Sequence, residues 1–383
     1  MQWSDLRDLA GTLGLSTSES KPGQRNARPR RPNRPHQHGA PRPDSLVEMV
    51  GQDRARTMLT VEIRGAALSG IHPGHTLLYG PPGLGKTSLA ELIASLAGGQ
   101  IIRSVGSQIS SPEIFVSTVG NLRWADQQNR PVVDTIFVDE IHRLPPRISE
   151  LFYMAMEDGR IEFRTGRGQN ARVESMTLPP FILVGATTLP GYLEQPFRDR
   201  FSLQLSLEYY SVEELLRIIT NAAESQSVKL DPDAALMLAE RSRATPRVAL
   251  RLLKTAKNFA YAVANSSDVP VTMDTVAQSL DLEEIDILGL DRDDRAVLLA
   301  LCGKHRGGPV GEGNLSASSG IDDRTVREAI EPYLIRAGLM NRTPRGRVAT
   351  EAAFDHLNAT QGLELECPAH LRATNAHGEP WAE

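Results

Sequence analysis

Hydrophobic positions follow two alternating patterns over the first half of the chain. Short apolar runs rich in β-branched residues predict strands over 75–79, 101–105, 135–140 and 181–188. Apolar residues three and four apart predict helices over 55–68, 88–96 and 112–119. Strands that alternate with helices are typical of an α/β domain with a buried parallel sheet.

From residue 211 to about residue 288 the sequence predicts helices and no strands. A capping box begins at Ser211, cap residues precede prolines at 231–232 and 245–246, and a further helix is expected over 272–280. We therefore expect a small helical domain.

The pattern changes again after residue 290. Helices are expected over 296–301, 314–318 and 324–337, and two short strands flank the turn at 343–346. Three helices and a terminal hairpin predict a winged helix-turn-helix. The hairpin carries Arg342, Arg345 and Arg347. These residues form either a phosphate-binding patch or a polar hairpin without a ligand.

Composition narrows the class of protein. The 383 residues are 40% hydrophobic with a net charge of −5, so nucleic acid would have to bind at local patches. The two separated cysteines form no C-x-x-C pair, so no zinc site is expected, and they suit a reducing cytosol. No apolar run is long enough for a membrane span, and a cytoplasmic protein without membrane contact is expected.

A basic segment precedes the periodic region. Residues 21–43 contain six arginines among prolines and no acid, which predicts a disordered arm. Attraction to phosphate backbones, a solvated linker and a mis-assigned start codon fit this arm equally well.

The sequence G-P-P-G-L-G-K-T at 80–87 fills every fixed position of the P-loop pattern between a predicted strand and a predicted helix. Its glycines, Gly83 and Gly85 among them, allow backbone N–H groups to surround phosphates. Lys86 would reach the β- and γ-phosphates, and the Thr87 hydroxyl would bind Mg²⁺.

Two later strands end in polar residues. The strand at 135–138 delivers Asp139 and Glu140, a Walker B pattern in which Asp139 would hold Mg²⁺ and Glu140 would deprotonate the attacking water. The strand at 181–188 ends in hydroxyls, and Thr187 could contact the γ-phosphate or simply cap the strand.

For three further features, the sequence alone leaves two interpretations open. The segment 160–177 predicts a hairpin with an exposed apolar flank that includes Ile161, either a partner surface or a variable loop. Arg200 could stabilise a transition state or form an ion pair. Arg247 begins a helix, where it could face a nucleotide or only solvent.

Seven runs of sequence, spread from residue 77 to residue 350, resemble those of one known family. They are LLYGPPGLGKTSLA (77–90), FVDEIHRLPP (137–146), LPPFILVGATT (178–188), RDRF (198–201), TPR (245–247), EPYLIRAGL (331–339) and RTPRGRVAT (342–350). The chain resembles the RuvB family of AAA+ ATPases, the motors of bacterial Holliday-junction branch migration. This resemblance implies an AAA+ P-loop domain with a parallel sheet, an all-α lid and a winged helix.

The resemblance also assigns roles to single positions. Catalysis would use Glu140, Thr187 and Arg200, the last as an arginine finger acting on the adjacent subunit, and Mg²⁺ would contact Thr87 and Asp139. DNA would contact Arg342, Arg347 and Arg324, which lies one residue from the family's arginine position, here Asp323. The expected ATP-binding positions are Arg42, Gly83, Gly85, Lys86, Thr87, Ser88, Glu157, Asp158, Gly159, Arg200, Tyr210 and Arg247.

The expected protein is an ATP hydrolase that drives branch migration with a RuvA-like partner bound at the 160–177 hairpin. A homohexameric ring, duplex DNA at Holliday junctions, a RuvC-like resolvase and ATP/ADP with Mg²⁺ complete the expected assembly. The alternatives are a clamp-loader-like or regulatory AAA+ switch acting on a protein partner, and a transcriptional regulator. The expected domains are an arm (1–41), a P-loop domain (42–207), a lid (208–288), a winged helix (289–358) and a flexible tail (359–383).

Overall fold

The computed structural model describes residues 45–46, 48–165 and 172–372, and it gives no side-chain surroundings for 163–174. The predicted arm, Arg42, the hairpin tip at 166–171 and the end of the tail at 373–383 lie outside the described residues. The chain divides into two compact units, Met1–Tyr209 and Tyr210–Glu383.

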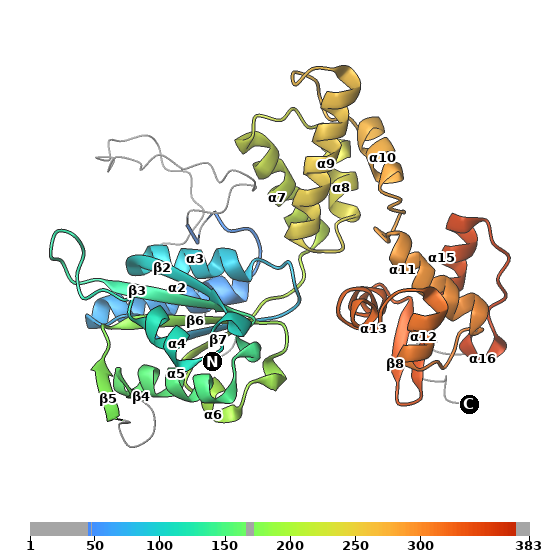
Figure 1. The fold of residues 1–383 in the computed structure, drawn as a ribbon. Helices are drawn as coiled ribbons and strands as arrows, with labels where there is room; N and C mark the ends of the chain where they lie inside the picture. The colour runs from blue at the N-terminus through green and yellow to red at the C-terminus, as the bar shows by residue number, and fades with distance from the viewer. Residues whose placement is uncertain (1–44, 47, 166–171, 373–383) are drawn as a thin grey trace. The chain divides into compact units, whose positions relative to one another are not determined.

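A parallel sheet forms the centre of the first unit, and its described strands follow the order β2-β3-β6-β1-β7 (Figure 1). The strands are β1 (Thr76–Tyr79), β2 (Gly98–Val105), β3 (Val133–Asp139), β6 (Phe181–Thr187) and β7 (Leu203–Ser206). β6 is buried along its whole length because it lies between two neighbours and under helices on both faces. The predicted parallel sheet is confirmed.

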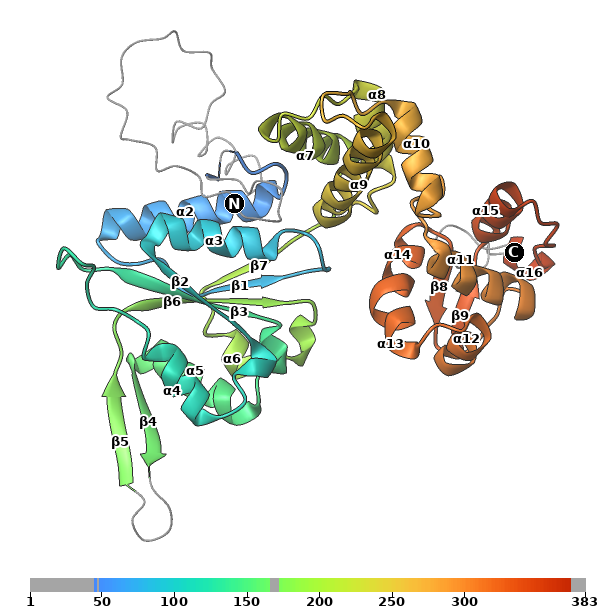
Figure 2. The ribbon, with the colours of Figure 1, turned by 45° about the horizontal axis from the view of Figure 1, so that its top comes forward.

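Helices cover both faces of this sheet (Figure 2). One face carries α2 (Asp53–Ser69) and α3 (Lys86–Ala97), and the other carries α4 (Pro112–Val119), α5 (Pro146–Asp158) and α6 (Gln195–Arg198). Phe115 of α4 meets Phe152 of α5 edge to face, with ring centroids 4.8 Å apart, in the core below the sheet.

A separate antiparallel hairpin, β4 (Arg160–Thr165) with β5 (Arg172–Thr177), projects from this unit (Figure 2). The predicted hairpin is therefore confirmed. The expected exposed apolar flank is wrong at Ile161, which is fully buried in the core where β4 leaves α5.

The second unit begins with the helical domain: α7 (Val212–Ser225), α8 (Pro232–Glu240), α9 (Pro246–Ala264) and α10 (Met273–Leu282). The capping box predicted at Ser211 is present with Glu214. Asp231 precedes α8 as expected, but its side chain makes no capping hydrogen bond.

The rest of the second unit is a winged helix. Its helices are α11 (Arg292–Leu299), extended by a π-helical turn at Ala300–Lys304, then α12 (Glu312–Ser319), α13 (Asp323–Thr325) and α14 (Glu331–Arg336). The wing is β8 (Met340–Thr343) paired with β9 (Gly346–Ala349), and Val310 bridges to Arg347 beside it. The helix expected over 324–337 contains a π-helical segment, Val326–Ile330.

The flexible tail predicted from residue 359 is wrong for residues 359–372. Helix α15 (Glu351–Gln361) continues past residue 358, and the Asn358 side chain bonds the Leu365 backbone at 3.0 and 2.8 Å. Leu371, in α16 (Ala369–Arg372), is buried in the winged-helix core. A few apolar residues are enough to fix this polar segment, because Leu371 fills a place in that core and Leu365 and Cys367 pack against it.

Within the described part of the chain, none of the helices combines the length and the apolar character that crossing a membrane requires.

Candidate functional site

The loop at 80–87 joins β1 to the first turn of α3. Gly80, Gly83 and Gly85 have positive φ angles of 139°, 83° and 94°, and a Cβ on Gly80 would lie 2.5 Å from the Leu207 carbonyl oxygen. Only glycine adopts this path without strain. Because α3 begins at Lys86, the loop surrounds a helix N-terminus, whose N–H groups and partial positive charge suit phosphates.

The side chain of Lys86 folds back over this loop. Its Nζ donates to the carbonyl oxygens of Gly80 and Pro81 at 2.7 and 2.8 Å, and the residue is 8% exposed. The ammonium group is therefore held at the centre of the loop.

The strand order brings the other predicted residues to the same edge of the sheet. β6 lies between β1 and β3, and the Gly80 N–H donates to the Thr187 carbonyl oxygen at 3.3 Å. Asp139 ends β3 at this edge, and its Oδ1 accepts the Glu140 N–H at 2.9 Å. The carboxyl ends of adjacent parallel strands are where α/β sheets bind ligands.

Among the described residues, no group of three or more His, Cys, Asp or Glu side chains could hold a metal ion by itself. One carboxylate, Asp139, and one hydroxyl, Thr87, fit Mg²⁺, which keeps several waters and takes phosphate oxygens as ligands.

Glu140 and Thr187 are connected by His142, a residue for which the sequence analysis assigned no role. His142 Nδ1 lies 2.8 Å from Thr187 Oγ1, and His142 Nε2 lies 3.4 Å from Glu140 Oε2. Thr187 is fully buried, and its Oγ1 also accepts the Leu189 N–H at 2.9 Å. The Thr187 hydroxyl is therefore engaged within the protein, whereas the next hydroxyl, on Thr188, is partly exposed.

Arg200 lies beside three other predicted nucleotide positions, Glu157, Asp158 and Gly159, on another part of this unit. Its guanidinium donates to Glu157 Oε2 at 2.9 Å and to the Tyr153 hydroxyl, and its Cζ is 4.3 Å from the centroid of the Tyr153 ring. Asp158 and Gly159 follow directly at the end of α5. The bond to Tyr153 and the charge of Glu157 raise the pKa of Arg200. No motif pointed to Tyr153; an aromatic residue one helical turn before Glu157 was the available signal.

In the helical domain, Arg247 is exposed on the first turn of α9, and the Thr245 Oγ1 at its N-cap accepts the Val248 N–H at 3.4 Å. Tyr210 is buried, and its backbone N–H donates to the Ala244 carbonyl oxygen at 3.1 Å. Both predicted residues thus lie near the loop that precedes α9.

The same loop connects the helical domain to the winged helix through Arg243. Its Nε donates to the Gly289 carbonyl oxygen at 2.8 Å, and one NH₂ group donates to Asp291 Oδ2 at 2.8 Å and to Asp294. Burial raises the pKa of Asp294 to about 7, in spite of the Arg243 charge. Sequence reasoning missed this contact because its partners lie more than forty residues away.

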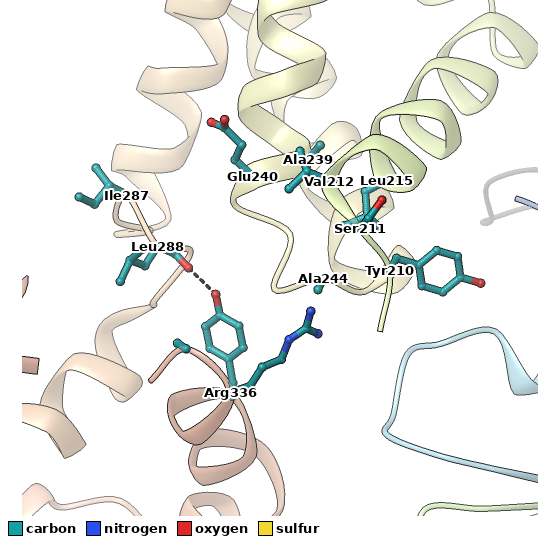
Figure 3. Close-up of a pocket in the computed structure, with 12 residues that line it drawn as sticks. Tyr210, Ser211, Val212, Leu215, Ala239, Glu240, Ala244, Ile287, Leu288 and Arg336 are labelled. Atoms are coloured by element: carbon teal, nitrogen blue, oxygen red, sulfur yellow. Dashed lines mark hydrogen bonds between the residues drawn. The ribbon is translucent and has the colours of Figure 1, made fainter. Parts of the chain in front are cut away.

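Beside this contact, the Tyr333 hydroxyl of α14 donates to the Leu288 carbonyl oxygen, and the Arg243 guanidinium lies over the Tyr333 ring. A pocket of about 490 Å³ adjoins it. In Figure 3, the Arg336 side chain extends from the winged helix toward Ala244 of the helical domain.

The arginines predicted to contact DNA differ in their surroundings. Arg342 is exposed, with its Nε 3.7 Å from Glu331 Oε1, and Arg324 is exposed and bonded to Glu328. Arg345, at the wing turn, is exposed and forms no ion pair with any described residue.

Arg347 is 6% exposed and does not extend from the wing as its sequence position suggested. Its guanidinium donates to Glu331 Oε2 at 2.8 Å and to Glu312 Oε2 at 2.8 Å. The wing itself has no acid, but the helices behind it supply two. In this arrangement Arg347 holds the wing against α12 and α14.

The P-loop, the acidic end of β3, the helical domain and the winged helix together define an AAA+ ATPase. The family models that match are the Holliday junction DNA helicase RuvB P-loop domain over residues 41–207, the RuvB AAA lid domain over 210–286 and the RuvB C-terminal winged helix domain over 287–358. The chain belongs to the RuvB family.

Curated relatives agree with this assignment. The chain is 43% identical over 323 residues to the Holliday junction branch migration complex subunit RuvB of Corynebacterium aurimucosum, covering 84% of this chain and 85% of the relative. The RuvB subunit of Nocardioides sp. is also 43% identical, over 85% of this chain and 88% of its own length.

Among solved structures, the Thermotoga maritima RuvB Holliday junction branch migration motor superposes with a TM-score of 0.72 at 38% identity, over 85% of this chain and 99% of that one. The predicted fold class and the prediction of a nucleotide-binding, RuvB-type motor ATPase are confirmed.

Proposed function

We propose that this ATPase drives branch migration at Holliday junctions by moving duplex DNA. Its relatives are named as subunits of the Holliday junction branch migration complex. The observation that carries the proposal is the meeting of P-loop, Asp139 and Glu140 at one sheet edge, in a chain that also has a winged helix. A RuvA-like protein is the expected partner, and the β4–β5 hairpin is its proposed docking segment. A RuvC-like resolvase and a cytoplasmic location stay predictions.

Each residue of the site has a proposed task. Lys86 exchanges its loop carbonyl partners for phosphate oxygens, and the N–H groups of Gly83, Gly85, Lys86, Thr87 and Ser88 enclose the phosphates. Mg²⁺, held by Thr87 and Asp139, would neutralise charge on the phosphates. Glu140 orients the attacking water and accepts its proton.

The proposed assembly is a ring, with a hexamer as the expected form. Arg200 would act on the neighbour's nucleotide, and Glu157-Asp158-Gly159, which lie beside it, would face the same nucleotide. An arginine finger that acts on the next subunit requires a head-to-tail interface. Subunits joined by such interfaces form a finite assembly only when they close into a ring. The subunit's own nucleotide is proposed to contact Arg42, Tyr210 and Arg247. Thr187 is proposed to act through the hydrogen bonds of its hydroxyl at the end of β6.

The DNA contact is proposed at the wing and the nearby helix, through Arg342, Arg345 and Arg324. Arg347 can contact DNA, as its sequence position predicts, only if its guanidinium leaves Glu331 and Glu312. Neutralising exposed phosphate contacts weakens binding evenly across sequences and lowers its salt dependence.

Replacing Arg345 and Arg347 separately should give different defects. Arg345→Ala should weaken duplex binding and reduce the slope of log affinity against log salt by about 1, with unchanged thermal stability. Arg347→Ala should lower the free energy of unfolding by about 3–5 kcal/mol, because it leaves the buried Glu331 with only the exposed Arg342, 3.7 Å away, as a cation. Salt titrations of DNA binding and chemical denaturation check both; equal stability of the two variants would contradict this division.

Transmission of the lid's movement to DNA is proposed to pass through Arg243. Its bonds to Gly289, Asp291 and Asp294 join the loop before α9 to the winged helix, four residues from Arg247. A lid that responds to nucleotide through Arg247 would then carry the winged helix with it.

Arg243→Ala should therefore uncouple the motor. We expect ATP turnover within about threefold of the wild type and a loss of about tenfold or more in junction movement per ATP, because a partly buried guanidinium with several charged and polar partners contributes about 2 kcal/mol or more. Arg241→Ala, which removes a single 3.4 Å bond to Asp286, is the matched control. Equal loss of hydrolysis and movement in Arg243→Ala would contradict this role.

The alternative is a regulatory AAA+ switch that acts on a protein partner. The winged helix and its exposed arginines favour the motor. Steady-state hydrolysis with random duplex DNA at several salt concentrations tests this. A motor is stimulated by DNA, and the stimulation falls steeply with salt; stimulation by a protein partner alone would favour the switch.

A further inference from the structure

The residue between the proposed base and the end of β6 is His142. Its side chain is 7% exposed and contacts Thr187 Oγ1 through Nδ1 at 2.8 Å and Glu140 Oε2 through Nε2 at 3.4 Å. Neither contact belongs to the P-loop or to the proposed metal position. A nearly buried imidazole with a polar partner at each nitrogen is oriented on both sides.

Hydrogen-bond accounting assigns a direction to this chain of contacts. Thr187 Oγ1 accepts the Leu189 N–H and keeps one proton of its own, which it can donate to Nδ1. The neutral imidazole then carries its proton on Nε2, which faces the Glu140 carboxylate. The opposite tautomer would turn a lone pair of Nε2 toward a negative charge.

The backbone under these side chains is tightly packed. Ile141 is fully buried, and a Cβ on Gly185 of β6 would lie 2.7 Å from Ile141 Cδ1. A Cβ on Gly106 would lie 2.4 Å from the Glu140 carbonyl oxygen. Glu140 itself has a φ of 49°, a left-handed conformation that costs energy in a non-glycine residue. The turn that bears His142 therefore has little room to shift.

We propose that His142 is a positioning residue for ATP hydrolysis: Thr187 orients its imidazole, and its Nε2–H holds the Glu140 carboxylate in the direction of the attacking water. The inference rests on the proposed role of Glu140. A catalytic base works best when a third group fixes its orientation, and loss of such a supporting partner commonly costs 10- to 100-fold. His142 acts only through Glu140, so it affects turnover and not nucleotide affinity.

Three replacements separate orientation from simple packing. His142→Ala removes both contacts, His142→Asn keeps a polar atom near Thr187 but is too short for Glu140, and His142→Gln can place an N–H near the position of Nε2. We expect Ala and Asn to lower kcat by about 10- to 100-fold with ATP KM within about threefold, and Gln to recover at least part of kcat.

The control is Tyr192→Phe, since the Tyr192 ring is 6.4 Å from the His142 ring and the residue is largely exposed. It should match the wild type. Thr187→Val should also lower kcat, and its effect should be much smaller when His142 is already Ala, because both act on one orientation.

The measurements are kcat and KM for ATP with saturating DNA, and the affinity for a non-hydrolysable ATP analogue. Wild-type turnover in His142→Ala, or equal losses in Ala and Gln together with weaker nucleotide binding, would overturn the inference. Absence of hydrolysis in the wild type would instead overturn the proposed function, and with it the role of His142; hydrolysis by the wild type that does not depend on His142 would overturn the inference alone.

Discussion

Glu140→Gln should lower ATP turnover by about 10²–10⁴-fold while ATP binding stays near the wild-type level. The amide has almost the same size as the carboxylate and can remain beside His142, but it cannot accept a proton from water. Lys86 and the loop glycines, which would bind the phosphates, are unchanged by the replacement.

The matched control is Glu194→Gln. Glu194 is exposed before α6, and its side chain makes no capping bond. Steady-state hydrolysis and equilibrium binding of ATP measure the two effects separately. If Glu140→Gln hydrolysed ATP at the wild-type rate, Glu140 would not be the base, and another group at the sheet edge would have to replace it.

Arg200→Ala should lower turnover by about 10³-fold within the assembled ring, with nucleotide affinity largely retained. The reason is the loss of a fixed positive charge at the transition state, supplied by the adjacent subunit. Arg198→Ala is the control, because Arg198 is a neighbouring arginine whose described side-chain bond is to Gln195.

Mixing two inactive variants tests the shared site directly. Arg200→Ala subunits keep their P-loop, and Lys86→Ala subunits keep their finger. In a mixed ring, the intact P-loop of one borders the intact Arg200 of the other, so hydrolysis should return in part. A mixture as inactive as its components would contradict a finger that acts between subunits.

The sequence predicted features that depend on local rules. The P-loop needs glycines at fixed spacing, and the capping box at Ser211 needs a hydroxyl and an acid three residues apart; both are found as expected. Helix α4 begins and ends where the pattern indicated because Pro112 starts it after the Ser111 cap.

Features that depend on distant residues could not be predicted in the same way. The wing arginines looked equivalent along the chain, yet Arg347 is buried against Glu331 and Glu312. Tyr153 under Arg200 and the Arg243 contacts likewise join residues that are over forty positions apart. Such pairings follow from packing, which periodicity and composition do not specify.

Branch migration of a synthetic four-way DNA junction, with ATP, Mg²⁺ and RuvA, is the most direct test of the central claim. The wild type should convert the junction into two duplexes by branch migration. It should fail to do so with a non-hydrolysable ATP analogue, and the Glu140→Gln variant should fail with ATP. Hydrolysis of ATP by the wild type that leaves the junction unmoved, with RuvA bound, would contradict a DNA motor.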